Sequence, residues 1–261
     1  MAEVKNSLIK SNEQPKIGAY LTNTAVKNRV NQLIGSEKGE RFIASLVSAV
    51  SMNPALQECD NSTILSGALV GESLGLQPSA FMGQYYLVPF KDNKNGRTVA
   101  QFQIGWRGYW QLAMRTGQYR KINVIAIKEG ELVKYNPLEE EIIVNLIEDD
   151  LIRENTPTIG YYAWFELVNG FRKTLYWSKA KMEKHAITFS KGYQAKKGYT
   201  FWEKDFDSMA TKTMLRQLIG KFGFMSVEMQ EAYQKDMAVI KEDNSYEYVD
   251  NPNDTQLHIN I

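Results

Sequence analysis

Apolar residues recur at helical spacing along the first part of the chain. In residues 25–34 and again in 42–50 they fall three or four positions apart, which predicts two amphipathic helices. Asn53-Pro54 ends the second helix, because the residue before a proline disfavours helical geometry. A third helix is expected to begin at Ser62, a residue type that caps helices, and to stop at Gly75.

The pattern changes to strand after this helical part. Residues 85–90 and 98–104 flank a polar loop that contains Asn95-Gly96, which is typical of a β-hairpin. A short helix is predicted over 106–115. Five further strands are predicted over residues 119–127, 131–135, 142–147, 159–167 and 172–177. This order of elements predicts an α+β protein with a helical N-terminal part and a central hairpin.

The last third of the chain is predicted to be mainly helical. Ser178 can cap a helix that reaches Ile187, and the basic, glycine-containing segment 189–200 is expected to be a mobile loop. A long helix is predicted over 201–221 and a last helix over 227–240. The expected organisation is a disordered N-terminus at 1–20, one domain at 21–240 and an acidic disordered tail at 241–261.

Composition is that of an ordinary globular protein, with 43% hydrophobic and 23% charged residues. The sequence contains no apolar run long enough to cross a bilayer, and its polar N-terminus does not resemble a signal peptide. Cys59 is the only cysteine, which favours a reducing compartment. A cytoplasmic protein without a membrane partner is therefore expected.

The net charge of +1 hides two basic blocks. Residues 84–134 hold nine Lys and Arg against three Asp and Glu, and residues 160–221 hold twelve against five. The segment 137–157 has one basic residue against seven acidic ones, and 224–261 has two against eight. This arrangement suits a face that binds a polyanion, although chance clustering of surface charge explains it equally well.

Several kinds of chemistry find no support in the motifs. No P-loop and no G-x-G-x-x-G string occurs, so a nucleotide cofactor is not expected. No zinc or EF-hand spacing occurs either, so no metal site is predicted and Mg2+ is expected at most to modulate activity. Gly71-Glu72-Ser73-Leu74-Gly75 spells the nucleophile elbow of α/β-hydrolases, with His185 as a possible base. That motif needs a preceding strand, whereas a helical pattern precedes Ser73, so a hydrolase is only an alternative.

The hairpin and the helix after it combine aromatic residues with cations, which can stack on bases and hold phosphates. Core packing is the competing interpretation, because Trp106, Tyr109 and Trp110 cannot all point one way on a helix. On the long helix, Lys212 and Arg216 lie one turn apart on one face. The DNA-binding candidates are Tyr86, Phe102, Gln103, Arg107, Arg115, Lys121, Lys181, Lys184, Lys191, Lys196, Lys197, Lys212, Thr213, Arg216, Gln217 and Lys221.

Five separated motifs resemble the RecT family of phage recombinases, over about residues 25–225. They are Asn53-Pro54-Ala55-Leu56, Gly75-Leu76-Gln77-Pro78, Gly83-Gln84-Tyr85-Tyr86-Leu87-Val88-Pro89-Phe90, Gln103-Ile104-Gly105-Trp106-Arg107-Gly108-Tyr109, and Trp202 followed by Lys212-Thr213 and Arg216-Gln217-Leu218. The resemblance implies a non-enzymatic protein that binds single-stranded DNA and anneals complementary strands without ATP in phage homologous recombination.

The resemblance also implies homo-oligomers, either rings or helical filaments, with DNA in a basic groove. It implies a bent antiparallel sheet crossed by a long helix, related to the eukaryotic single-strand annealing fold. The partners that it implies are single-stranded and annealing duplex DNA, a phage 5′–3′ exonuclease and the single-strand-binding protein of a bacterial host cell. A nuclease and a purely structural phage protein are further alternatives to annealing.

Overall fold

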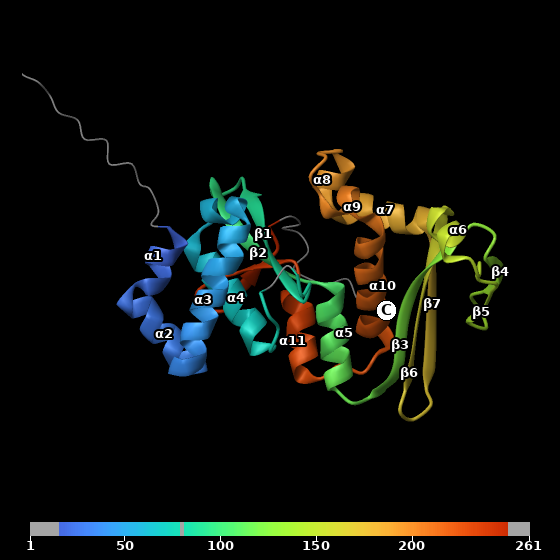
Figure 1. Ribbon diagram of the computed structural model, residues 1–261, viewed down its shortest axis with the longest axis horizontal. Helices are drawn as coiled ribbons and strands as arrows, with labels where there is room; N and C mark the ends of the chain where they lie inside the picture. The colour runs from blue at the N-terminus through green and yellow to red at the C-terminus, as the bar shows by residue number, and fades with distance from the viewer. Residues whose placement is uncertain (1–15, 79–80, 250–261) are drawn as a thin grey trace, which may run out of the picture.

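The computed structural model describes residues 16–78 and 81–249 (Figure 1). The chain begins with a group of helices that forms one end of an elongated molecule. These elements are α1 (Ile17–Thr22), α2 (Thr24–Ile34), α3 (Ser36–Met52), the 3-10 helix η1 (Pro54–Glu58) and α4 (Asn61–Ser73). The predicted helices over 25–34 and 42–50 and the stop before Pro54 are confirmed.

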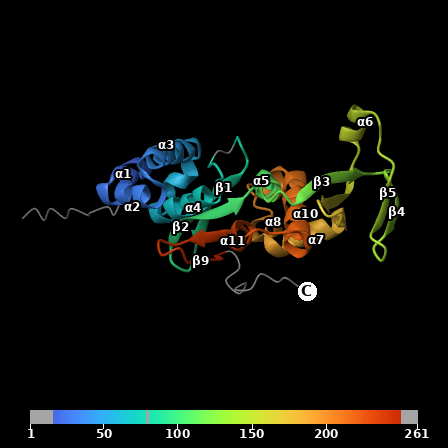
Figure 2. The ribbon, with the colours of Figure 1, turned by 90° about the horizontal axis from the view of Figure 1, so that it is seen from below.

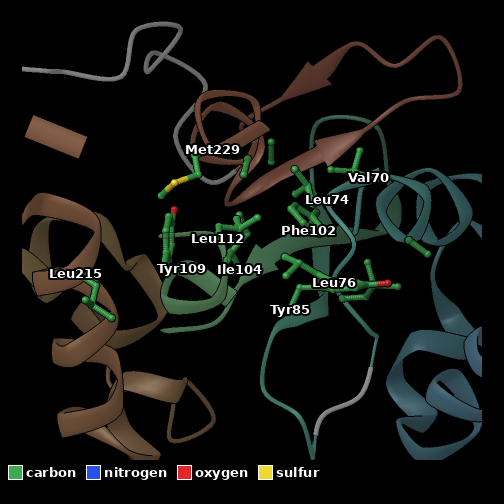
Figure 3. Packing of buried hydrophobic residues seen from close by; sticks show 14 of the residues in the cluster. Val70, Leu74, Leu76, Tyr85, Phe102, Ile104, Tyr109, Leu112, Leu215 and Met229 are labelled. Atoms are coloured by element: carbon green, nitrogen blue, oxygen red, sulfur yellow. The ribbon is translucent and has the colours of Figure 1, made fainter. Parts of the chain in front are cut away.

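The hairpin forms one side of a four-stranded sheet with strand order β1-β2-β8-β9, in which β1 is an edge strand. Its strands are β1 (Tyr85–Asp92), β2 (Arg97–Ile104), β8 (Ala238–Ile240) and β9 (Tyr246–Glu247). α4 packs on β2, and α11 (Val227–Lys235) lies beside the same sheet, so the end of the chain returns to the N-terminal helices (Figure 2). Figure 3 shows the core of this N-terminal lobe, with Phe102 and Ile104 of β2 beside Leu74 and Leu76.

A second lobe is built on an antiparallel sheet with strand order β3-β6-β7. Its strands are β3 (Tyr119–Lys128), β6 (Thr158–Leu167) and β7 (Arg172–Ser178). The long helix α10 (Phe206–Phe222) packs across this sheet and against α5 (Trp106–Arg115), which joins the two lobes. The smaller helices of the lobe are α7 (Lys179–Phe189), α8 (Lys191–Gln194) and α9 (Phe201–Lys204). The α+β class and the antiparallel sheet crossed by a long helix are therefore confirmed.

An arm projects from the second lobe at the end opposite to the N-terminal helices (Figures 1 and 2). It consists of the strand pair β4 (Leu132–Asn136) and β5 (Glu141–Val144) followed by the short helix α6 (Asp150–Asn155). The strand predicted over 142–147 is thus shorter than expected, and α6 was not predicted.

Four details differ from the sequence-based expectation. α4 is capped by Asp60, whose side chain accepts from the Ser62 backbone N–H, so Ser62 is not the cap residue. The helix expected over 201–221 breaks into α9 and α10 at Asp205, because the Asp205 carboxylate caps the start of α10. The segment expected to be a loop contains the helical turn α8, capped by Ser190. Residues 238–240 form a strand paired with β2 instead of the end of a helix.

The expected termini also differ where the structure describes them. α1 begins at Ile17, inside the segment 1–20 that was expected to be disordered, and Ile17 and Leu21 are buried against the core. β9 lies inside the segment 241–261, where pairing with β8 orders it. The remainder of both predicted disordered segments, residues 1–15 and 250–261, lies outside the described residues.

Candidate nucleic-acid interface

A cavity of about 760 Å3 lies between the two lobes, where α5, β3 and α10 meet. Its wall combines two tryptophans, one arginine and several short polar side chains. The lining residues are Met82, Gln84, Trp106, Arg107, Trp110, Gln111, Asn123, Val124, Asp207, Ser208, Thr211 and Leu215. The volume lies in the range of cavities that hold small organic ligands, so a nucleobase fits within it.

Two glycines place the start of α5 at this cavity. A Cβ atom on Gly105 would lie 2.1 Å from the carbonyl oxygen of Gly83, and one on Gly108 would lie 2.1 Å from that of Gln84. Only glycine therefore lets the first turn of α5 lie directly on the backbone that precedes β1. The Gly105 N–H donates to the Gln84 carbonyl at 2.9 Å, which fixes this approach.

Trp106 and Trp110 are one helical turn apart and both line the cavity. Tyr109 points the other way and is buried in the core. The Arg107 side chain is exposed, donates to the Phe81 carbonyl at 3.3 Å and lies with its guanidinium 5.3 Å from the Trp106 ring centre. An aromatic surface and an exposed cation therefore lie side by side in the lining of the cavity.

The wall contributed by α10 is polar but carries no cation. Ser208 and Thr211 present hydroxyls, and Asp207 presents a carboxylate that accepts a hydrogen bond from the Tyr161 hydroxyl. Burial raises the pKa of Tyr161, and the hydrogen bond to Asp207 raises it further, so the phenol remains protonated. This hydrogen bond ties the start of α10 to β6 and fixes the α10 side of the cavity.

The two cations of α10 that sequence analysis singled out point away from this cavity. Asp236 is fully buried and accepts from the Ile104 N–H at 2.8 Å and the Tyr109 hydroxyl at 2.9 Å. The Lys212 ammonium lies 3.4 Å and the Arg216 Nε 3.5 Å from the same carboxylate. We call these four groups around Asp236 the Asp236 network, which joins α10 to α5, β2 and the chain before β8.

Comparison with known proteins gives two relatives of substantial similarity. The chain is 42% identical to the uncharacterized protein YqaK of Bacillus subtilis over 234 residues, covering 90% of this chain and 74% of YqaK. It is 30% identical to Protein RecT of Escherichia coli over 200 residues, covering 76% of this chain and 71% of that protein. A sequence profile of the RecT family matches residues 40–250. The chain belongs to the RecT family. RecT family proteins are DNA recombination proteins that anneal single strands and are not catalytic enzymes in general.

The structure places the predicted DNA-binding residues in different environments, some buried and some exposed. Lys212 is buried in the Asp236 network and Thr213 is buried with its hydroxyl bonded to the Met209 carbonyl, so neither contacts DNA in this conformation. Arg216 is turned inward, with its guanidinium 4.6 Å from the Tyr233 ring centre and bonded to the Tyr233 carbonyl. The prediction that this helix presents a cationic stripe is therefore wrong, because one buried carboxylate draws both cations inward.

Packing corrects the prediction for Phe102 and gives Arg115 a structural contact. Phe102 is fully buried and stacks near Tyr85 at 5.3 Å between ring centres, so it cannot wedge between bases. Arg115 is exposed but donates to the Leu74 and Gly75 carbonyls at 2.7 and 2.8 Å. It therefore closes the C-terminal end of α4, while its role in DNA binding stays a prediction.

The remaining candidates lie at or near the surface. Tyr86 is half-buried and its ring centre lies 6.1 Å from that of Phe201 in α9, which links the hairpin to the α8–α9 segment. Gln103 and Gln217 are half-buried, and the Gln103 amide donates to Gln101 at 2.7 Å. The exposed lysines are Lys121 on β3, Lys181 and Lys184 on α7, Lys191, Lys196 and Lys197 in and after α8, and Lys221 at the end of α10.

The charge of Lys221 affects Lys181, although the two lysines lie on the different helices α10 and α7. Burial lowers the pKa of Lys181, and the like charge of Lys221 lowers it further. The Lys181 ammonium also lies 4.5 Å from the Trp177 ring centre. These contacts gather cations between α7 and the end of α10, away from the lining of the cavity.

The residues that line the cavity were mostly missed by sequence analysis. Trp106 and Trp110 stood among the aromatic candidates, but the ambiguity over which way the helix faces kept them out of the predicted site. Their spacing of four residues, with Gly105 and Gly108 around the first of them, is the signal that could have selected them. The short polar residues of α10 carried no such signal, because serine and threonine are common on any helix surface.

The alternative functions gain no support. Ser73 is the last residue of α4 and donates to the Val70 carbonyl at 2.8 Å, so a helix precedes it where a nucleophile elbow needs a strand. Within residues 16–78 and 81–249, no group of three or more His, Cys, Asp or Glu side chains is arranged to hold a metal ion. In the same ranges, no helix has both the length and the apolar character that a membrane span requires.

Proposed function

We infer that the protein binds single-stranded DNA in the cavity between its lobes and anneals a complementary strand without ATP, in phage homologous recombination. The observation that carries this proposal is the pair Trp106 and Trp110 beside Arg107, facing short polar groups of α10 across an open cavity. Aromatic stacking accepts any base, which suits a protein that must act on every sequence. The proposed activity, annealing, comes from membership of the RecT family, and the cavity is the proposed place where the strand binds.

In the proposed mechanism the protein holds a strand without reading it. One or two bases stack on the tryptophans, Arg107 neutralises an adjacent phosphate, and the exposed lysines of α7 and α8 extend the track. Bases outside the cavity keep their pairing edges free, and Watson–Crick pairing then tests the sequence of the second strand. Pairing supplies on the order of 1.4 kcal/mol per stacked step, so no nucleotide hydrolysis is needed.

Several finer features of the proposal come from the family resemblance. We propose that the protein acts as a homo-oligomer, a ring or a helical filament, in the cytoplasm of a bacterial host. Its proposed partners are a phage 5′–3′ exonuclease and the host single-strand-binding protein. No cofactor is proposed, and Mg2+ is proposed only to modulate annealing through the DNA charge. We also expect the fold to be related to the eukaryotic single-strand annealing proteins.

The decisive experiment compares two tryptophan substitutions. Trp110→Ala removes a stacking surface worth about 1–3 kcal/mol per base, so affinity for a short oligonucleotide should fall by roughly 5–150-fold. Trp110→Phe should recover part of this loss. Trp164→Ala is the matched control, because Trp164 lies under the Arg172 guanidinium at 4.6 Å and does not line the cavity.

Affinity is measured by fluorescence anisotropy, and annealing of complementary oligonucleotides is followed without ATP. Thermal melting of each variant separates lost binding from lost folding. If Trp110→Ala remains folded and binds and anneals as tightly as the Trp164→Ala control, the cavity is not the strand-binding site. If DNA is shortened when Mg2+ is added, the nuclease alternative replaces annealing.

A further inference from the structure

The arm exposes large apolar side chains on α6 and at its strand turn. Leu151 is 72% and Ile152 59% exposed on α6, and Leu138 is exposed at the turn between β4 and β5. Two adjacent, largely exposed apolar residues on one short helix, Leu151 and Ile152, are the feature that indicates an interaction surface.

The exposed apolar residues belong to a firmly held helix. The Arg153 side chain points inward from α6 and donates to the fully buried Glu131 carboxylate at 2.6 Å and to the Ala126 carbonyl at 2.7 Å. Glu131 also accepts from the Lys128 and Ile147 backbone N–H groups. Because this inward ion pair fixes the orientation of α6, Leu151 and Ile152 are presented to the outside rather than left there by disorder.

The surroundings of these apolar residues are acidic. Glu148, Asp150 and Glu154 are exposed, and none of them forms an ion pair with another residue that the structure describes. Unpaired carboxylates around an apolar centre favour a partner surface that is apolar in the middle and basic at its rim.

The N-terminal lobe carries a surface of this kind at the other end of the molecule. A groove of about 770 Å3 lies between α3 and a wall to which residues 77, 78, 81 and 85–87 contribute. Its exposed apolar residues include Met52, 80% exposed, and Phe81, 89% exposed. Lys38 and Arg41 lie along its α3 side, where Arg41 also forms an exposed ion pair with Glu37 at 2.6 Å, and Glu72 is an acidic residue of the lining.

We propose that α6 of one protomer docks into the α3 groove of a second copy of this chain. Leu151 and Ile152 enter the groove, while Asp150 and Glu154 face Lys38 and Arg41. A short helix that lays its apolar face in such a groove is a recurrent mode of recognition. The inference deepens the homo-oligomer proposed above and rests on it, but it does not depend on where DNA binds.

The geometry determines the kind of assembly. The arm and helix α3, which lines the groove, lie in opposite halves of the elongated molecule (Figures 1 and 2), so each protomer can use both surfaces at once. An interface between two different surfaces is heterologous, and it closes into a ring or continues as a helical filament. A two-fold symmetric dimer uses the same surface on both protomers, so contact between α6 and the α3 groove does not predict one.

The test uses two variants that each block one surface. Leu151→Asp with Ile152→Asp blocks the arm, and Lys38→Glu with Arg41→Glu blocks the groove. Each variant alone should be monomeric by mass photometry at concentrations at which the wild type assembles, with and without a short oligonucleotide. Mixed in equal amounts they should form dimers and nothing larger, because each pair retains one intact arm and one intact groove.

Val168→Asp is the matched control, since Val168 lies in a turn of the second lobe and is also 59% exposed. This control should assemble as the wild type does. Adding Asp150→Lys and Glu154→Lys to the groove-blocked variant should restore assembly by exchanging the charges. Circular dichroism verifies that every variant is folded.

Three outcomes would overturn the proposed interface. The wild type could be monomeric alone and with DNA, the folded arm-blocked variant could assemble normally, or the mixture could remain monomeric. Oligonucleotide binding per protomer is measured in the same samples. If the blocked variants behave as expected but no protein binds DNA, only the proposed function fails, and the interface stands.

Discussion

Replacing Asp236 by alanine removes the one carboxylate that the Asp236 network contains. The change leaves the Lys212 ammonium and the Arg216 guanidinium facing each other in the interior without their acid. It also leaves the Ile104 N–H and the Tyr109 hydroxyl without the carboxylate to which both donate. Burial already lowers the pKa of Lys212, and loss of Asp236 removes the charge that partly opposes this shift.

Breaking a buried ion pair by removing one partner costs about 3–5 kcal/mol, because the charge left behind is desolvated without compensation. For a protein of this size, each kcal/mol lowers the melting temperature by about 2–4 °C. Asp236→Ala should therefore lower the melting temperature by about 6–20 °C. The effect should exceed that of Lys212→Met, which replaces one of two cations by an apolar side chain and leaves Arg216 paired.

The assay is urea denaturation followed by circular dichroism at pH 7, supported by thermal melting. Glu37→Ala is the control, because Glu37 forms an exposed ion pair with Arg41 whose loss costs about 0–1 kcal/mol. If Asp236→Ala unfolds within about 1 kcal/mol of the wild type, or if Lys212→Met destabilises the protein more than Asp236→Ala does, the assignment of Asp236 as the centre of the network is refuted.

Three further predictions concern single residues. Arg107→Ala should leave stability unchanged and should reduce the slope of log affinity against log salt by about 0.7, as measured by oligonucleotide titrations; an unchanged slope would exclude a phosphate contact. Arg115→Ala should lower the melting temperature, because it frees the end of α4, while the salt slope stays the same. Burial, and secondarily the charge of Arg216, lowers the pKa of His185 to about 4. Its neutral form is therefore favoured by folding, so stability is complete above about pH 6.5 and falls as the pH drops towards 4. In His185→Phe, the free energy of unfolding should fall by up to about 3 kcal/mol less between pH 6.5 and pH 4 than in the wild type, as measured by denaturation at a series of pH values. An unchanged dependence of stability on pH would contradict the buried, neutral state of His185.

Local signals gave the boundaries of most elements. The glycines and prolines placed the ends of the early helices, and alternation placed the hairpin and the strands of the second sheet. The errors arose where a side chain far along the chain decides the outcome. Residues 238–240 continue the predicted pattern of the last helix, but they become a strand because β2 offers an edge with which they pair.

The predicted site failed for a different reason. Charge along a helix shows which residues are cationic, but it does not show what lies against them. Lys212 and Arg216 have the spacing of an exposed stripe, and only the return of the chain at Asp236 reveals that they face the interior. Phe102 likewise alternates within a hairpin whose two faces cannot be told apart until α4 covers one of them.

Because Lys212 and Arg216 face the interior, the proposed site must bind a strand with fewer cations than the sequence predicted. Among the described residues that line the cavity, Arg107 is the only cation. If the proposed site binds a strand, one protomer neutralises few phosphates there, and the tryptophans supply most of the local affinity. Stacking by itself binds only a base or two at each site. A long strand is then held tightly only if many such sites are linked, because each further contact is made at a high effective concentration. Weak individual sites joined by assembly also leave each base free to exchange partners, which is what a test for complementarity requires.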